Sequence, residues 1–167
     1  MFRTTVKVVS PLMTSNKVLC ALQFAYESEP LATNAKTLRR LILQAPEDSI
    51  ILAPELCLSG YRYDSMHEAA LFSSTFLPKM YELSSRKTIG LTLITQEEEH
   101  FFNTFMLFHK GECVYTQHKA HLFALGNEEK YFQAGQKEAI RVIDIEGIKI
   151  AVLICFELRF SELWEQI

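Results

Sequence analysis

The sequence predicts an α/β fold, and three observations support this class. Short apolar runs rich in strand-forming residues alternate with a stretch of helical periodicity. Two later segments carry the short turns that are typical of β-hairpins. The chain of 167 residues is 49% hydrophobic and 22% charged, a composition typical of a globular protein with a sizeable core. We therefore expect one domain in which helices cover at least one face of a sheet.

The first expected elements are a strand, a helix and a second strand. Residues 16–25 ("NKVLCALQFA") are rich in strand formers, and residues 34–45 repeat apolar side chains at helical spacing. Residues 48–56 ("DSIILAPEL") form a short apolar strand that Pro54 ends, because proline cannot donate a hydrogen bond to a ladder. Glu55 is therefore expected at the C-terminal end of a strand.

The later elements follow in a simple order. We expect an irregular segment that becomes helical, a strand, an exposed acidic turn and two hairpins, in residues 61–86, 87–95, 96–100, 101–122 and 140–155. The last strand would run up to Cys155. Because ligands of open α/β sheets gather at the C-terminal ends of strands, Glu55 and Cys155 are predicted to share one site.

The net charge and the short apolar runs argue against nucleic acid and membrane partners. The net charge is −3 and basic residues are scattered, so we expect no nucleic acid partner. No apolar run approaches the roughly 18 residues that span a bilayer, so we expect no membrane partner. Arg3 and Lys7 precede no continuous signal-peptide core, which favours a cytoplasmic location.

Cys155 differs from the other three cysteines. Cys20, Cys57, Cys113 and Cys155 form no CxxC pair, so we expect reduced thiols, most of them in the core. A helix that begins just after Cys155 would favour its thiolate and make it a nucleophile. The polar side chains of that helix would form a solvated face or reach into the site; they are Glu157, Arg159 and Glu162.

Three histidines offer an alternative chemistry. His109, His118 and His121 cluster around the first hairpin, so a Cys–His hydrolase stays open as an alternative. It predicts that changing His118 or His121 abolishes activity while Glu55→Gln does not. Zinc sites repeat their ligands in pairs, and "CVYTQHKAH" (residues 113–121) lacks the second pair. We therefore expect no metal.

Several separated motifs resemble those of the nitrilase superfamily of carbon-nitrogen hydrolases, in the same order. They are "APELCLSGY" (residues 53–61), "FNT" (102–104), "HKAHLF" (118–123), "EEKYFQAG" (128–135) and "ICFELRF" (154–160). Each motif alone is weak, but the set is specific. The resemblance covers the chain from about Lys17 to its last residue.

The resemblance implies a Glu-Lys-Cys triad. Cys155 would attack a small non-peptide amide and form a thioester, releasing ammonia and then a carboxylate. Glu55 would act as general base and then as acid. Lys119 and the backbone N–H of Phe156 would stabilise the oxyanion. No cofactor is implied.

Supporting roles are carried over with less detail. A second glutamate near Lys119 matches Glu128, with Glu129 as the rival assignment. "CFELRF" is similar to the omega-amidase-like branch, which cleaves monoamides of small dicarboxylates, so Arg159 would bind a carboxylate if it faces the pocket. Tyr61 is expected to support the site. N-carbamoyl amides and nitriles stay open as substrates.

The length of the chain departs from the family pattern. Residues 1–167 are expected to form one carbon-nitrogen hydrolase domain, with residues 1–16 as a lead-in. The domain would be an αββα sandwich truncated at its C-terminus, because relatives continue beyond the helix that follows the nucleophile. A full-length form would be a homo-oligomer. The alternative is a catalytically inactive truncated homologue or a partner-binding remnant.

Overall fold

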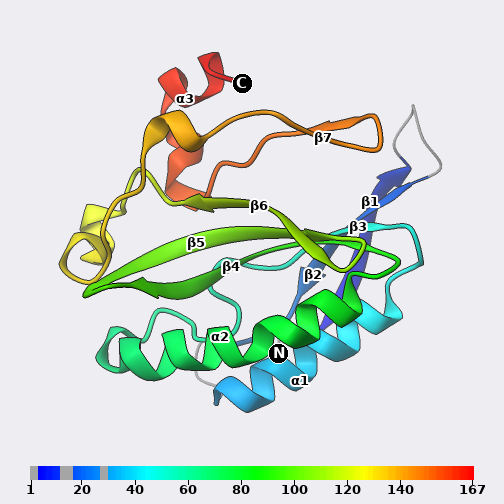
Figure 1. The fold of residues 1–167 in the computed structure, drawn as a ribbon, viewed down its shortest axis with the longest axis horizontal. Helices are drawn as coiled ribbons and strands as arrows, with labels where there is room; N and C mark the ends of the chain where they lie inside the picture. Colours follow the sequence, from blue (N-terminus) through cyan, green and yellow to red (C-terminus); the bar gives the residue numbers. More distant parts are fainter. Residues whose placement is uncertain (1–3, 12–16, 27–29) are drawn as a thin grey trace.

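The computed structural model describes residues 4–11, 17–26 and 30–167 and shows a six-stranded mixed sheet (Figure 1). The strands lie in chain order: β1 Thr5–Pro11, β2 Val18–Gln23, β3 Ile50–Leu52, β4 Thr88–Glu97, β5 His100–His109 and β6 Glu112–His118. The pairs β2–β3 and β3–β4 are parallel, and the other neighbours are antiparallel. Parallel neighbours need crossover connections, and these are supplied by helices α1 (Leu31–Gln44) and α2 (Met66–Leu83).

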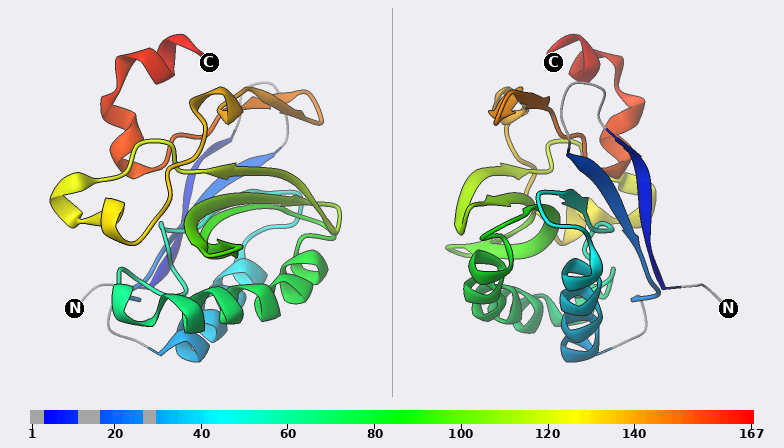
Figure 2. Two further views of the ribbon diagram at one scale, coloured as in Figure 1. Left: turned by 60° about the vertical axis from the view of Figure 1, so that its left-hand side comes forward. Right: turned by 90° about the vertical axis from the view of Figure 1, so that its right-hand side faces the viewer.

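Both helices cover the same face of the sheet (Figures 1 and 2). Helix α1 buries Leu38, Leu41 and Ile42 fully, as its apolar periodicity predicts. These side chains share one core with residues of the parallel strands, among them Ile51 and Ile89. The packing of this helix against the sheet fixes the positions of the parallel strands and of the residues at their ends.

A two-stranded hairpin packs on the opposite face of the sheet (Figure 1). Its strands are β7 (Ile143–Ile145) and β8 (Ile148–Ile150). Ile145 and Ile154 belong to a second core cluster with Phe105, Leu107 and Tyr115 of β5 and β6. The layers in the described residues are therefore helices, six-stranded sheet and hairpin, and the expected α/β class is confirmed.

An ion-pair cluster fastens the turn of this hairpin to the sheet. The Glu146 carboxylate lies 2.7 Å from Lys17 Nζ and 2.5 Å from Lys110 Nζ. Hydrogen bonds from Lys110 and Lys17 hold the pKa of Glu146 down at about 2. The turn of the β5–β6 hairpin and the turn of the β7–β8 hairpin are thereby joined at one end of the molecule.

Strand β8 ends earlier than the sequence suggests. We expected a strand up to Cys155, but the last rung of the ladder pairs Ile143 with Ile150. The partner strand begins at Ile143, so residues 151–154 continue without a ladder. The short helices η5 (Cys155–Arg159) and α3 (Ser161–Glu165) follow in place of one helix.

The start of the chain also adds an element. The segment expected as a lead-in contains β1, which pairs with β2, while residues 1–3 and 12–16 lie outside the described residues. Helix α2 and both hairpins form where the sequence predicts them, with turns at Lys110–Gly111 and Glu146–Gly147. None of the helices in the described ranges is long and apolar enough to cross a bilayer.

Candidate active site

Glu55, Lys119 and Cys155 line a single cavity of about 430 Å³. They come from three segments far apart in the sequence: the turn after β3, the end of β6 and the start of η5. The loop after β6 and the segment from Cys155 onward lie at the same side of the molecule in Figure 1 and in the left view of Figure 2. The remaining lining residues are Tyr61, Tyr63, Phe123, Gly126 and Glu128.

The Glu55 carboxylate is held by three donors. Oε1 accepts hydrogen bonds from Lys119 Nζ at 2.8 Å and from Asn103 Nδ2 at 2.8 Å. Oε2 accepts a hydrogen bond from the Tyr61 hydroxyl at 2.9 Å. The next residue, Leu56, has a left-handed backbone with φ 48°, an uncommon conformation for a branched side chain. Glu55 is therefore fixed in direction as well as in position.

Lys119 lies between two carboxylates. Its Nζ is 2.8 Å from Glu55 Oε1 and 2.9 Å from Glu128 Oε1, and its side chain has no exposed surface. The second oxygen of Glu128 accepts the backbone N–H of Phe123 at 2.8 Å. The Lys119 backbone N–H donates to the carbonyl of Asn103 at 2.8 Å. This arrangement is a buried ion triad in which one ammonium group bridges two carboxylates.

Burial and charge have opposite effects in this triad. Burial acts to raise the pKa of Glu55, but the Lys119 charge and the bonds from Tyr61 and Asn103 hold it below its ordinary value. Burial likewise acts to lower the pKa of Lys119, but Glu55 and Glu128 raise it above its ordinary value. Both groups are therefore ionised at neutral pH.

Cys155 is a protonated thiol at neutral pH, contrary to the expected helix effect. Desolvation, followed by the charge and hydrogen bonding of Glu55, raises the pKa of Cys155 above its ordinary value. Helix η5 is only five residues long, so it does not offset the nearby carboxylate. The Glu55 carboxylate is then the group that can accept the thiol proton.

The backbone at Cys155 is strained. Its φ is 48°, in the left-handed region that residues with a Cβ seldom occupy. Such conformations cluster at functional sites, where the surrounding structure holds them in place. Cys155 is exposed, whereas Cys20 and Cys57 are buried.

Some of the expected supporting residues lie in the cavity and others do not. Glu128 is buried in the triad, whereas Glu129 is exposed, which favours the first assignment. Tyr61 bonds to Glu55, as already described. Phe156 follows Cys155 at the start of η5, where backbone N–H groups lack partners within the helix. Arg159 is exposed and does not line the cavity.

The structure does not bring the three histidines into this cavity. His118 Nδ1 lies 2.8 Å from the Thr104 hydroxyl, and the His121 ring stacks on Phe160. His109 Nε2 lies near Glu146, at the hairpin turn. In the part of the chain that the structure describes, no three His, Cys, Asp or Glu side chains are grouped as a metal site.

Sequence reasoning missed three residues around the site. Asn103 is fully buried in β5 and bonds to Glu55, and Tyr63 lines the cavity. Glu157 is fully buried, although we expected a solvated face or a side chain directed into the site. A polar Asn within the apolar run "FFNTF" was a usable signal, because buried polar groups need partners. Nothing local distinguished Glu157 from its exposed neighbours.

Gly135 gives a prediction about the position of Lys119. Its N–H donates to the Lys119 carbonyl, and an added Cβ would lie 2.5 Å from the carbonyl oxygen of His118. We expect Gly135→Ala to displace the Lys119 segment and lower the free energy of unfolding by about 1–3 kcal/mol, measured by urea denaturation. Gly147→Ala is the control, since a Cβ there meets nothing within 4 Å and tests turn strain alone. A loss below about 0.5 kcal/mol in Gly135→Ala would contradict the crowding at Gly135.

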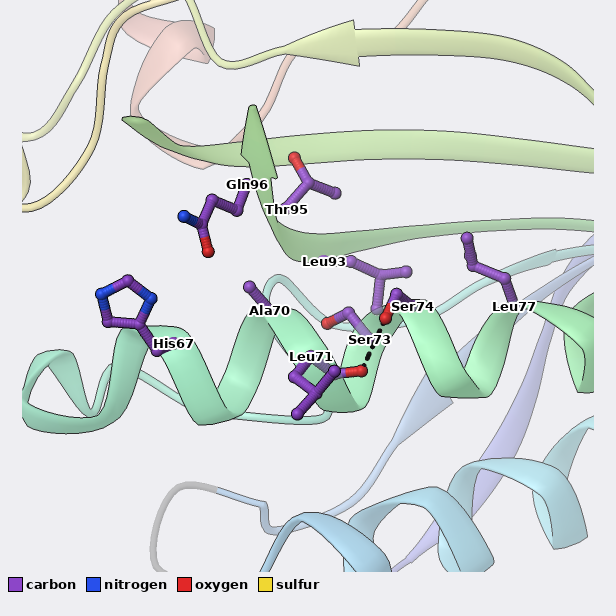
Figure 3. Close-up of a pocket in the computed structure, with 9 residues that line it drawn as sticks. All are labelled: His67, Ala70, Leu71, Ser73, Ser74, Leu77, Leu93, Thr95 and Gln96. Carbon is purple, nitrogen blue, oxygen red and sulfur yellow. Dashed lines mark hydrogen bonds between the residues drawn. The ribbon is translucent and has the colours of Figure 1, made fainter. Parts of the chain in front are cut away.

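A second cavity lacks comparable chemistry. It measures about 380 Å³ and lies between α2 and β4 (Figure 3). His67, Leu71, Leu77 and Gln96 are among the residues that line it. No acid and no cysteine line it, so it provides neither a nucleophile nor a carboxylate base.

The chain belongs to the carbon-nitrogen hydrolase family, whose model matches residues 19–167. It is 26% identical to a 2-oxoglutaramate amidase of Bacillus subtilis over 118 residues, which cover 68% of this chain and 45% of that protein. It is 29% identical to an omega-amidase of Escherichia coli over 117 residues, covering 66% of this chain and 43% of that protein.

A solved structure of similar fold comes from Saccharomyces cerevisiae and is described as a member of the nitrilase superfamily. The TM-score is 0.67 at 24% identity, covering 83% of this chain and 55% of that one. The match of the family model to residues 19–167, together with the amidase relatives, confirms the expected membership of this superfamily. The chain spans about half the length of the curated relatives it matches.

Proposed function

We propose that the cavity hydrolyses the carbon-nitrogen bond of a small amide through a cysteine thioester. The observation that carries this proposal is the triad of Glu55, Lys119 and Glu128 in one cavity with the exposed Cys155. A strained cysteine beside an ionised carboxylate and a buried ammonium group has the parts that acyl transfer needs.

The first half-reaction forms the thioester. Glu55 accepts the Cys155 proton as the sulfur attacks the amide carbonyl carbon. The Lys119 ammonium and the N–H of Phe156 stabilise the resulting oxyanion. The carbon-nitrogen bond then breaks, and Glu55 returns the proton to the leaving ammonia.

The second half-reaction releases the acid. Glu55, again a carboxylate, takes a proton from water as the water oxygen attacks the thioester carbonyl. The carbon-sulfur bond breaks, Glu55 returns its proton to the Cys155 sulfur, and the product acid leaves and gives its own proton to the solvent. Glu128 holds Lys119 in place during both halves.

The proposed substrate is a monoamide of a small dicarboxylate. Two curated relatives are a 2-oxoglutaramate amidase and an omega-amidase, which supports this class. A cavity of about 430 Å³ suits a small molecule. Lys119 is engaged by two carboxylates, so the free carboxylate of the substrate needs another cation. Arg159 of η5, exposed and outside the cavity lining in this structure, is the candidate in this chain.

The test measures ammonia release by the 167-residue chain from glutaramate, succinamate and the uncharged propionamide. We expect release from the first two, with intact-mass spectrometry showing an acyl adduct on Cys155. Cys155→Ala should abolish both signals, while Cys113→Ala, a change at a second thiol, should leave them. Arg159→Ala should raise KM for both glutaramate and succinamate, because each carries a free carboxylate. Ammonia release that survives Cys155→Ala would refute the proposal.

A further inference from the structure

Glu157 is a buried carboxylate that the reaction described above does not use. Its side chain has no exposed surface. Oε1 accepts the backbone N–H of Ala120 at 2.6 Å and of His121 at 3.3 Å, and Oε2 accepts the N–H of Ile154 at 2.7 Å. Among the described residues this carboxylate forms no ion pair, so these backbone bonds are what offset the cost of its burial.

The three donors belong to the two segments that must meet in the cavity. Ala120 and His121 directly follow Lys119, and Ile154 directly precedes Cys155. Glu157 therefore joins the Lys119 segment to the Cys155 segment through a single side chain. The ladder of β8 has already ended at Ile150, so strand pairing does not fix the position of Cys155.

We infer that Glu157 is a positioning residue that sets the Cys155 sulfur against Lys119 and Glu55. This inference rests on the proposed function, because the sulfur must lie where the oxyanion donors can reach the attacked carbonyl. Glu157 lies outside the cavity lining and touches no reacting atom.

The role requires a group that only accepts hydrogen bonds. All three donors are backbone N–H groups, which cannot reverse their direction. Glutamine has the same shape as glutamate, but its amide nitrogen would face at least one of these donors. The apolar contacts of Ile154 would remain, so Glu157→Gln should keep the fold and separate the two segments.

The test is the pH profile of Cys155 alkylation by iodoacetamide, followed by peptide mass mapping. Burial and Glu55 raise the pKa of Cys155, so a displaced thiol should titrate closer to its ordinary value of 9.0. We expect Glu157→Gln to lower the midpoint of the profile and to slow amide hydrolysis by about tenfold to a hundredfold. Glu165→Gln, an exposed acid of α3, should match the wild type.

A second variant keeps the test decisive if the glutamine chain fails to melt cooperatively. Glu157→Asp keeps the charge but is one methylene shorter, so it should shift the profile in the same direction by less. A folded Gln or Asp variant whose profile and hydrolysis rate coincide with the wild type would overturn the inference. If no variant and no wild type releases ammonia, the proposed function fails, while the alkylation profile still tests the positioning.

Discussion

Lys119→Ala is expected to lower the free energy of unfolding by about 3–5 kcal/mol. The substitution leaves Glu55 and Glu128 without their shared cation, with side chains only 11% and 3% exposed. Removing one partner of a buried ion pair strands an uncompensated charge, and here two charges of the same sign are stranded. Urea denaturation at pH 7 measures the loss.

The same variant should reverse the acid dependence of stability. In the wild type, the pKa of Glu55 lies below its ordinary value of 4.5, so its stabilising effect is present above pH 4.5 and is lost as the pH falls through the lowered pKa. Without Lys119, burial dominates and raises the pKa of Glu55. The variant should then gain stability as the pH falls from 7 toward 4, where the wild type does not.

A surface lysine provides the control for this prediction. Lys79 pairs with Glu82 on the exposed side of α2, and Lys79→Ala should change stability little at either pH. A loss for Lys119→Ala below about 1 kcal/mol, the range of exposed pairs, would contradict the buried triad.

Glu55→Gln is expected to slow amide hydrolysis by about a hundredfold to ten-thousandfold. The change removes the proton acceptor, yet it should preserve the fold. Glutamine can still accept from Lys119 and Asn103, and the Tyr61 hydroxyl can rotate to accept the new amide N–H. The expected readout is ammonia release from glutaramate at saturating concentration.

Thiol reactivity should move in the opposite direction. The charge of Glu55 helps to raise the pKa of Cys155, so removing that charge lowers the pKa and increases the thiolate fraction at pH 8. We expect faster alkylation by iodoacetamide in Glu55→Gln together with slower hydrolysis. Glu129→Gln, an exposed neighbour of the triad, should change neither rate. A parallel fall of both rates would indicate a structural role for Glu55 instead of a base.

Much of the fold was predictable because its signals are local. Helical spacing placed α1, and the turns at Lys110–Gly111 and Glu146–Gly147 placed both hairpins. The grouping of Glu55, Lys119 and Cys155 followed from motifs whose family supplies the missing long-range information. Composition and spacing alone would have left the histidines as rivals.

The features that escaped prediction depend on partners distant in the chain. Glu157 is buried by backbone groups 36 and 37 positions away, and Asn103 meets Glu55 across 48 positions. The pKa of Cys155 likewise follows from Glu55 and not from the short helix at its own position. Strand β8 ends at Ile150 because its partner strand β7 begins at Ile143. The sequence of residues 151–154 gives no sign of this end.

The hairpin that leads to Cys155 is attached to the rest of the molecule at two points of different chemistry. One attachment is the partly exposed carboxylate of Glu146, which forms ion pairs with Lys17 and Lys110. The other is the buried carboxylate of Glu157, which accepts hydrogen bonds from backbone N–H groups. Dissolved salt screens exposed charges over a Debye length of about 8 Å at physiological ionic strength but affects buried bonds much less. Raising the ionic strength should therefore weaken the attachment at Glu146 while the reactive thiol stays in place.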